Sequence, residues 1–421
     1  MGSASVTQSS GESLSTVTNT MWQRFTVEYA YPVSFTRDLF NLRNPLLRDT
    51  LTQREPDKRH RCLVFLDEGV LDARPDLGER IAAYARAWPE SLELLGKPVT
   101  LCGGENIKSD TQGIEQMQET IFEHRVDRHS YVIGVGGGAL LDACGYAAAT
   151  AHRGIRHLRV PTTVLSQNDS GVGVKNGINR FGQKNWMGTF APPFAVLNDQ
   201  DFIDALPERD RIAGMAEAVK VALIRDADFY AWLEQNSEAL RAFRTDAMRT
   251  MIERCAALHL RQIGHGGDPF ETGSARPLDF GHWSAHRLEQ LTQYELRHGE
   301  AVAIGIALDT RYSVTCGLLD AGSENRVCAL LESLGFVLWH PKLALLDSGG
   351  ELEILRGLDD FQEHLGGELT ITLLGGLGHG VEVHTIDRVQ VTDAIDWLAD
   401  RQAKNGYRQV RSAHRADLLT G

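Results

Sequence analysis

The sequence predicts an α/β domain built on a parallel sheet, followed by an all-α domain. Up to about residue 205, short apolar runs typical of buried strands alternate with segments of helical periodicity. From Leu206 onward, apolar residues recur with the 3.6-residue period of helices. The length of 421 residues also exceeds that of one small domain. We therefore expect residues 21–205 to form the α/β domain and residues 206–421 the helical domain.

Each element of the first domain has its own signal. Residues 1–20 are rich in Ser, Thr and Gly, and we expect disorder there because large apolar side chains are almost absent. A weak alternation at 22–35 predicts early strands. The elements that follow are a buried strand at 62–70, a helix at 77–95, a strand and turn at 97–105, a helix at 113–125, a strand, glycine turn and Ala-rich helix at 130–154, and a strand at 156–163. Such alternation gives parallel strands joined by right-handed crossovers.

Composition and charge exclude several classes of protein. The net charge is −13 and no basic block is present, which disfavours nucleic-acid binding. No apolar run reaches 18 residues, and the N-terminus lacks the pattern of a signal peptide. The six cysteines are scattered without CxxC spacing, so we expect buried free thiols. These features predict a cytoplasmic protein whose partners are neither nucleic acid nor membrane.

A run of three glycines, Gly136, Gly137 and Gly138, follows an apolar strand and opens a helix. Glycine permits positive φ and a close approach of backbone N–H groups, and a helix N-terminus attracts a pyrophosphate. The spacing is not that of the GxGxxG dinucleotide motif, so a packing turn is the alternative interpretation. Asp142, in the first turns of the helix, is either a helix-start charge or a cofactor contact.

Polar residues at neighbouring strand ends extend this pattern. Asp67 ends the first buried strand, where a carboxylate can accept hydrogen bonds from ribose hydroxyls. Glu105 and Lys108 follow the next strand and are suited to a ribose and a phosphate, although a solvated turn is the alternative. Each of these positions favours nucleotide binding only in combination with the others.

A long polar segment spans residues 161–185. Loops of this length are uncommon in compact domains unless they are functional, and a solvated β-hairpin is the alternative. The segment carries both donors and acceptors, including Asp169, Lys175, Lys184 and Asn185. In an otherwise acidic chain, these lysines favour a cradle for a phosphorylated polyol.

The helical half carries a set of candidate metal ligands. His282 and His286 are four residues apart on one helix face, and His298 opens the next helix. Glu217 and Lys220 are three apart on an earlier helix. Two imidazoles and one carboxylate suit Zn²⁺ with positions left open for substrate. Spacing alone leaves open which two histidines bind the metal.

Five motifs occur in one order along the chain: GGGALLD, RGIRHLRVPTTVLSQNDSGVGVKNGIN, GMAEAVK, GHWSAH and HGEAVAIG. In this combination the chain resembles the sugar phosphate cyclases, whose best-known member is 3-dehydroquinate synthase, from about Leu63 to about Leu373. The resemblance implies a Rossmann-like NAD domain followed by a helical metal domain, an active site between them, and a homodimer.

The resemblance also assigns residues. It implies a metal, Zn²⁺ or else Co²⁺ or Fe²⁺, on Glu217, His282 and His298, with His286 near the substrate phosphate. The implied NAD contacts are Asp67, Glu105, Lys108, Gly136, Gly137, Gly138, Asp142, Thr162, Thr163 and Lys184. The implied substrate contacts are Asp169, Lys175, Asn185, Lys220 and Glu271, and Arg153 is expected to reach the phosphate site of a neighbouring subunit. Of these residues Lys220, His286, Asp169 and Glu271 are the candidate catalytic groups.

Departures from the 3-dehydroquinate synthase pattern fall in the substrate pocket. The segment before the GH pair is ETGSARPLDFGH, which puts Ala275 where an arginine would bind a substrate carboxylate, with Arg276 displaced by one. Asp279 replaces an asparagine, and Arg261 replaces a lysine. Residues 359–368 lack the lysines of a late family element. The changes favour a non-shikimate branch, resembling 2-epi-5-epi-valiolone synthases or the 3-dehydroquinate-synthase-like proteins of bacterial ebo clusters.

The resemblance implies a reaction without net redox change. NAD would oxidise a phosphorylated ketose such as sedoheptulose 7-phosphate transiently, the metal would assist, phosphate would be eliminated, and an aldol step would close a carbocycle. Three alternatives stay open: 3-dehydroquinate synthase proper, a metal-dependent polyol dehydrogenase, and a non-catalytic binding protein on the same fold.

Overall fold

The computed structural model describes residues 20–181, 183–271, 277–364 and 367–417. The predicted disorder of residues 1–20 falls almost entirely outside this range. The described residues from Tyr31 onward form one compact unit. No helix among the described residues has the length and apolarity needed to cross a bilayer.

The first half of the chain is organised around one parallel sheet. Among the described residues it has seven strands in the order β1-β9-β6-β5-β2-β3, with β4 also pairing with β2. Their bounds are Val33–Thr36 (β1), His60–Asp67 (β2), Leu92–Leu94 (β3), Val99–Leu101 (β4), Tyr131–Gly136 (β5), Arg156–Pro161 (β6) and Ala195–Asp199 (β9). Every pairing is parallel, so the predicted sheet is confirmed.

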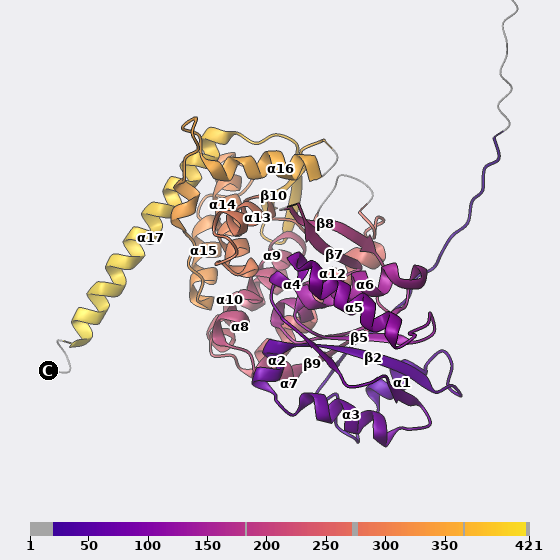
Figure 1. Ribbon diagram of the computed structural model, residues 1–421. Helices are drawn as coiled ribbons and strands as arrows, with labels where there is room; N and C mark the ends of the chain where they lie inside the picture. The colour runs from indigo at the N-terminus through magenta and orange to yellow at the C-terminus, as the bar shows by residue number, and fades with distance from the viewer. Residues whose placement is uncertain (1–19, 182, 272–276, 365–366, 418–421) are drawn as a thin grey trace, which may run out of the picture. The chain divides into compact units, whose positions relative to one another are not determined.

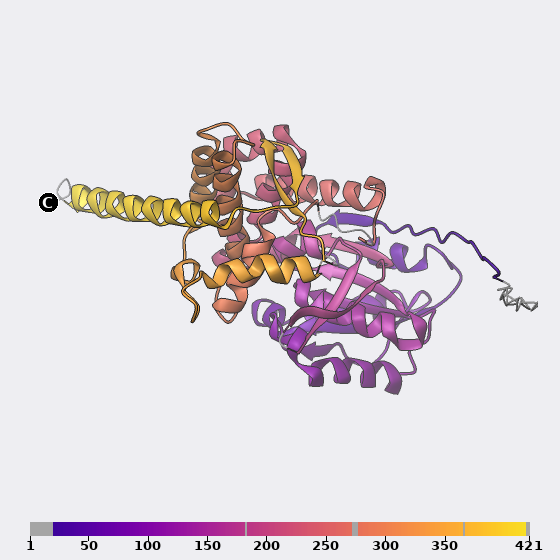
Figure 2. The ribbon, with the colours of Figure 1, turned by 90° about the horizontal axis from the view of Figure 1, so that it is seen from above.

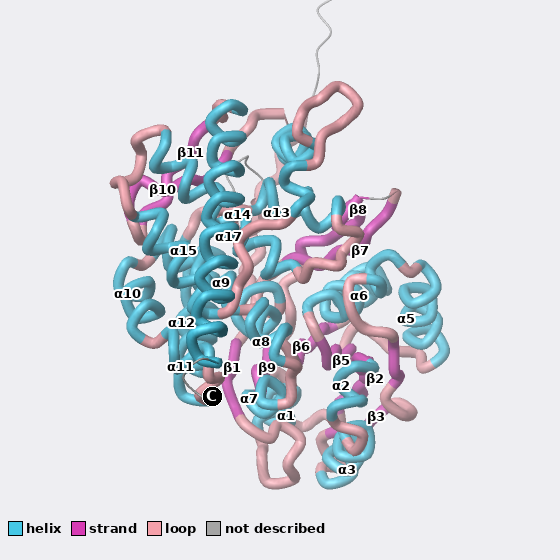
Figure 3. Tube along the Cα trace, turned by 90° about the vertical axis from the view of Figure 1, so that its left-hand side faces the viewer, coloured by secondary structure: helices cyan, strands magenta, loops and turns pink. Residues whose placement is uncertain are grey.

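Helices cover both faces of this sheet (Figures 1 and 3). Their bounds are Leu46–Thr52 (α1), Glu68–Ala73 (α2), Leu77–Ala87 (α3), Asn106–Ser109 (α4), Thr111–Glu123 (α5), Gly138–Thr150 (α6) and Gln200–Asp204 (α7). Along β2, Cys62, Val64 and Leu66 pack toward α1 and α3, and Leu63 and Phe65 pack toward α5 and α6. Burial on both faces explains why these strands are continuous apolar runs.

The second half packs helices around a large apolar core. The bounds are Glu208–Ala213 (α8), Met215–Arg225 (α9), Ala227–Gln235 (α10), Ser237–Arg241 (α11), Thr245–His265 (α12), His282–Leu291 (α13), His298–Thr315 (α14), Ser323–Leu334 (α15), Arg356–His364 (α16) and Arg388–Asp417 (α17). Helices α9 and α14 are buried along most of their length. A two-stranded hairpin, Ile371–Gly376 (β10) and His379–Val383 (β11), also packs against α9 and α14, which helical periodicity does not predict (Figure 2).

The polar segment at 161–185 differs most from expectation. It forms a π-helical turn, Ser166–Ser170 (η2), and then an antiparallel hairpin of Lys175–Arg180 (β7) and Gln183–Phe190 (β8). The alternative of a β-hairpin is therefore found in place of the flexible loop, although most of β7 is buried and not solvated. The first strand is buried although it is polar, because its side chains have partners. The fully buried Arg159 donates hydrogen bonds to the carbonyl of Lys175 (3.0 Å) and to Oδ1 of Asn176 (2.7 Å).

Smaller corrections have local causes. The helix expected at 77–95 ends at Ala87, because Trp88 precedes a proline and is disfavoured in the α conformation. The early strands expected at 22–35 reduce to β1. Two of the six free cysteines, Cys102 and Cys316, are exposed, so the expectation that all would be buried is wrong.

The packing of α13 against α14 can be tested at Gly281, the N-cap residue of α13. Its φ of 76° is left-handed, and an added Cβ would lie 2.7 Å from the amide nitrogen of Ile306. Gly317 has a similar φ of 75° but no atom within 4 Å of such a Cβ. We expect Gly317→Ala to lower the free energy of unfolding by about 1–2 kcal/mol from backbone strain. Gly281→Ala should cost about 1–3 kcal/mol more because the helix contact is overpacked. Urea unfolding measures both, and equal losses would contradict the close approach.

Candidate active site

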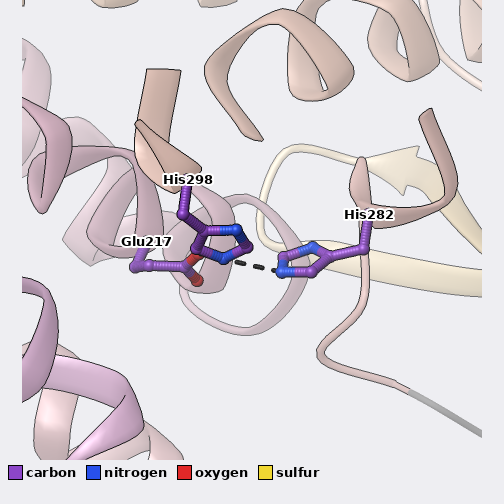
Figure 4. Close-up of side chains that lie close together, drawn as sticks. All are labelled: Glu217, His282 and His298. Atoms are coloured by element: carbon purple, nitrogen blue, oxygen red, sulfur yellow. Dashed lines mark ion pairs between the residues drawn. The ribbon is translucent and has the colours of Figure 1, made fainter. Parts of the chain in front are cut away.

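Three side chains from three helices converge in the second half (Figure 4). Oε1 of Glu217, on α9, lies 3.8 Å from Nε2 of His282, on α13, and 3.5 Å from Nε2 of His298, on α14. One ligand atom from each residue lies within 4.8 Å of the others. Ligand atoms at this separation, in a carboxylate and two imidazoles, fit a metal ion with bonds of about 2.0–2.2 Å after a small contraction.

Close helix packing brings these residues together. Glu217 lies in the first turn of α9, and His298 is the first residue of α14. A Cβ on Gly299 would lie 1.8 Å from the carbonyl oxygen of Ala213, just before α9, so only glycine lets the two helix N-termini meet. Asp309, in α14, holds the turn before His282 by accepting a hydrogen bond from the Gly281 amide (3.1 Å).

The hydrogen bonds of the two histidines leave the same ring nitrogen available in each. Nδ1 of His282 donates to the carbonyl of Phe280 (3.1 Å), and Nδ1 of His298 donates to Oε2 of Glu289 (3.1 Å). A nitrogen that donates carries the proton, so the lone pair lies on Nε2 in the neutral ring. Both Nε2 atoms face Glu217, which is the arrangement that metal ligation requires.

Glu217 is fully buried, and its charge depends on its neighbours. The ammonium of Lys220, one turn further along α9, lies 2.5 Å from Oε2. Burial opposes ionisation, but Lys220 and the two imidazoles outweigh it and hold the pKa of the Glu217 carboxyl well below its usual range. The carboxylate is therefore ionised at neutral pH.

A second ion pair lies beside this cluster. Oδ1 of Asp169, from η2, is 2.9 Å from Nε2 of His259, on α12, and Nδ1 of His259 donates to the carbonyl of Cys255 (3.0 Å). Burial opposes the charges, but each partner stabilises the other, which lowers the pKa of Asp169 and raises the pKa of His259. Asp169, Glu217 and His259 also satisfy the spacing of a metal site, but the direct Asp169–His259 contact accounts for this pair without an ion.

Acidic and basic groups alternate around these two pairs. Lys175 lies 2.6 Å from Oε2 of Glu271. Burial opposes ionisation of Asp279, but His282 and two lysines outweigh it and lower the pKa of this carboxyl. His286, one turn after His282, has its ring centroid 5.3 Å from that of His282 and 5.9 Å from that of His298. Three of the four candidate catalytic groups, Lys220, Asp169 and His286, therefore adjoin the Glu217 cluster, and Glu271 pairs with Lys175.

The candidate dinucleotide site lies where the strand order reverses, between β2 and β5. Asp67 ends β2, and Gly136 ends β5 just before the N-terminus of α6. Ligands of open α/β sheets bind at such a point. None of the three glycines has a positive φ, so the prediction that they adopt a positive φ is wrong. Glycine is needed for space, since a Cβ on Gly136 would lie 2.5 Å from Leu140 and one on Gly138 2.5 Å from Ser170.

The two threonines predicted to contact NAD adjoin this point. The amide of Thr162, which follows β6, donates to the carbonyl of Gly136 (3.0 Å). The hydroxyl of Thr163 caps the next turn through the amide of Ser166 (3.1 Å). Burial raises the pKa of Asp67, although backbone N–H groups of Gly69 and Gly137 partly offset it. The carboxyl edge of the sheet thus places the Asp67 carboxyl and the two threonines beside the N-terminus of α6.

A polar network extends this edge. Nζ of Lys108 lies 2.8 Å from Oδ2 of Asp142 and also donates to the side chain of Asn185. Glu105 accepts a hydrogen bond from Asn179 (3.1 Å). Asn185, a predicted substrate contact, thus lies in one network with Lys108 and Asp142, which are predicted NAD contacts.

Two other predicted residues, Arg261 and Arg153, are exposed. Arg261 is exposed on α12, and His259 is the residue of that helix that reaches Asp169. Arg153 is exposed after α6, outside the cluster, and Arg276 lies outside the described residues. His259 and Glu289 were not among the predicted site residues. Their signal was helical spacing, since His259 follows Cys255 by four residues and Glu289 follows His286 by three.

Comparisons with known proteins agree with this architecture. Residues 98–213 match the family model for the 3-dehydroquinate synthase N-terminal domain, and residues 214–349 match the C-terminal one. A 3-dehydroquinate synthase of Halorhodospira halophila is 34% identical over 346 residues, which cover 79% of this chain and 95% of that protein. The chain therefore belongs to the 3-dehydroquinate synthase family, within the sugar phosphate cyclases.

Two solved structures are also similar. One is a 2-epi-5-epi-valiolone synthase of Streptomyces hygroscopicus subsp. jinggangensis with NAD⁺ and Zn²⁺ bound, with 28% identity, a TM-score of 0.79, and coverage of 90% of this chain and 100% of that one. The other is a 2-deoxy-scyllo-inosose synthase complexed with carbaglucose-6-phosphate, NAD⁺ and Co²⁺, with a TM-score of 0.69 and coverage of 86% and 95%. At 22% identity, the second similarity shows the fold alone.

Metal content distinguishes the candidate ligand sets. We expect His282→Ala to lose stoichiometric zinc, because one of three ligands is removed. His286→Ala, one helical turn away, is the matched control and should retain about one equivalent, since its imidazole is outside the Glu217 set. Elemental analysis of both purified variants gives the answer. Full zinc in His282→Ala, or loss of zinc in His286→Ala, would contradict the assignment.

Proposed function

We propose that the protein is an NAD- and metal-dependent sugar phosphate cyclase that acts on a ketose phosphate without a carboxylate, of the sedoheptulose 7-phosphate type. The observation that carries this proposal is the ionised Asp279, three residues before His282, in surroundings where Lys220 is paired with Glu217 and His259 with Asp169. Family membership supports a phosphate-eliminating carbon–oxygen lyase, and the pocket charges support the choice of substrate.

The residues fit the two cofactors of such an enzyme. Zn²⁺, or Co²⁺ or Fe²⁺ in its place, would be held by the Glu217 cluster. NAD would lie at the N-terminus of α6, with Asp67 and the Lys108 network along its length. When bound, NAD supplies reversible hydride transfer and the metal supplies a Lewis acid for hydroxyl groups.

The chain's own residues divide the remaining work. Lys220 stabilises negative charge that develops on a substrate oxygen beside Glu217. Asp169, held by His259, accepts a hydrogen bond from a substrate hydroxyl. Lys175 and His286 bind the phosphate, and Arg153 of a second subunit joins them in a homodimer. The same groups hold the phosphate while it is eliminated.

The charges of the pocket explain the preference for a substrate without a carboxylate. A substrate carboxylate needs a cation beyond those that hold the phosphate, but Lys175 is assigned to the phosphate and the imidazole of His259 is paired with Asp169. The ionised Asp279 adds repulsion in the same region. A hydroxyl group can donate to these carboxylates, whereas a carboxylate cannot.

The main alternative is 3-dehydroquinate synthase itself, the activity named for relatives at 34% identity. It requires a pocket that accepts an acidic seven-carbon phosphate. A polyol dehydrogenase is disfavoured by the lysine-bearing hairpin, and it would accumulate NADH, which absorbs at about 340 nm, whereas a cyclase would not. We place the activity in the cytoplasm, in keeping with six free thiols.

A substrate panel tests the proposal. We expect phosphate release from sedoheptulose 7-phosphate, with no net NADH and with a carbocyclic product of matching mass. The carboxylate-bearing substrate of 3-dehydroquinate synthases should react at least about tenfold more slowly in kcat/KM, the ratio that 1.4 kcal/mol of charge repulsion produces. A preference for the acidic substrate, or no phosphate release from either, would contradict the proposal.

Asp279→Asn is the matched variant for the same assay, since it removes one charge and keeps the shape. The ratio of kcat/KM for sedoheptulose 7-phosphate to that for the carboxylate-bearing substrate should fall about tenfold, toward equality. An unchanged ratio would mean that Asp279 does not set the preference.

A further inference from the structure

Glu289 is a buried carboxylate that the proposed reaction does not use. It lies on α13, three residues after His286, and is 3% exposed. Burial opposes its ionisation, but Lys184 and His298 outweigh this effect and hold the pKa of Glu289 well below its usual range. An ionised carboxylate is costly to bury unless partners hold it by hydrogen bonds and opposite charge.

Both oxygens of Glu289 are engaged, each by a different half of the chain. Oε2 accepts a hydrogen bond from Nδ1 of His298 (3.1 Å), and Oε1 accepts one from Nζ of Lys184 (2.9 Å). Lys184 belongs to β8 of the hairpin, and Glu105 of the dinucleotide edge also acts on its charge. The carboxylate is thus fixed from two sides and cannot rotate away from His298.

This contact decides which way the His298 ring points. A hydrogen bond that holds Nδ1 leaves the ring one orientation, with Nε2 3.5 Å from Oε1 of Glu217. Carboxylates that accept from the far nitrogen of a ligating histidine fix its tautomer and raise its basicity. We propose that Glu289 is a positioning residue that aims Nε2 of His298 at the metal. The inference rests on the proposed metal binding.

An alternative role for Glu289 is that of a metal ligand. His286, Glu289 and His298 satisfy the spacing of a cation site. An ammonium 2.9 Å from Oε1 opposes a second cation there, and the hydrogen bond to His298 uses the other oxygen. The geometry therefore favours a carboxylate that orients a ligand over one that binds the ion directly.

The test compares Lys184→Met with Lys184→Met/Glu289→Gln. Both lack the lysine, so neither contains an unpaired buried ammonium, and they differ only in the charge of residue 289. Zn²⁺ affinity of the metal-free protein is measured by competition with a chelator. We expect Lys184→Met to bind Zn²⁺ within about threefold of the wild type or more tightly, because it loses a positive charge and keeps the acceptor. The double variant should bind about 10–100-fold more weakly.

Two further measurements complete the design. Gln290→Ala, at the next position of α13, is the control, since its side chain contacts Arg287 and not His298. Urea unfolding in excess chelator reports stability without metal, which the Lys184→Met pair should share within about 0.5 kcal/mol. A difference of less than threefold in Zn²⁺ affinity within this pair overturns the inference. Absence of Zn²⁺ binding by the wild type would instead overturn the proposed function.

Discussion

The site depends on one buried negative charge. Glu217 lies in the first turn of α9 and has no exposed surface. Burying an ionised carboxylate there costs several kcal/mol unless cations lie beside it. Lys220 supplies one cation, and two imidazoles from α13 and α14 face the same oxygen. The three helices can meet only because glycine occupies the crossing points, as at Gly299 against Ala213. Packing and electrostatics therefore specify the same arrangement, in which one carboxylate and two imidazoles could hold a metal ion.

The β7–β8 hairpin connects this centre with the sheet. Both of its predicted site lysines pair with glutamates of the second half, Lys175 with Glu271 and Lys184 with Glu289. The same hairpin carries Asn185, which joins the Lys108 network at the dinucleotide edge. Lys175 is also the proposed phosphate ligand, and Lys184 is paired with Glu289, so neither lysine is left for a substrate carboxylate. This shortage of available cations, more than the loss of a single arginine, supports a ketose phosphate without a carboxylate as the substrate.

The sequence predicted the elements whose periodicity is strong. The apolar strand of Cys62–Asp67 and the glycine turn before α6 are found where expected, as is the change to helices after Asp199. Buried polar strands were not predictable, because Asn176 in β7 is satisfied by Arg159, a partner distant in sequence. For the same reason, His259 and Glu289 appear ordinary in the sequence, since their roles come from contacts with η2 and α14. Spacing left the choice among three histidines open, and the family resemblance, not periodicity, singled out His282 and His298.

Anomalous X-ray diffraction at the zinc absorption edge, from crystals grown with Zn²⁺, tests the central claim most directly. The account predicts a single strong peak about 2.0–2.2 Å from one Glu217 oxygen and from Nε2 of both His282 and His298. A peak between Asp169 and His259, or one held by His286 and Glu289, would contradict it, as would the absence of any ordered zinc near Glu217.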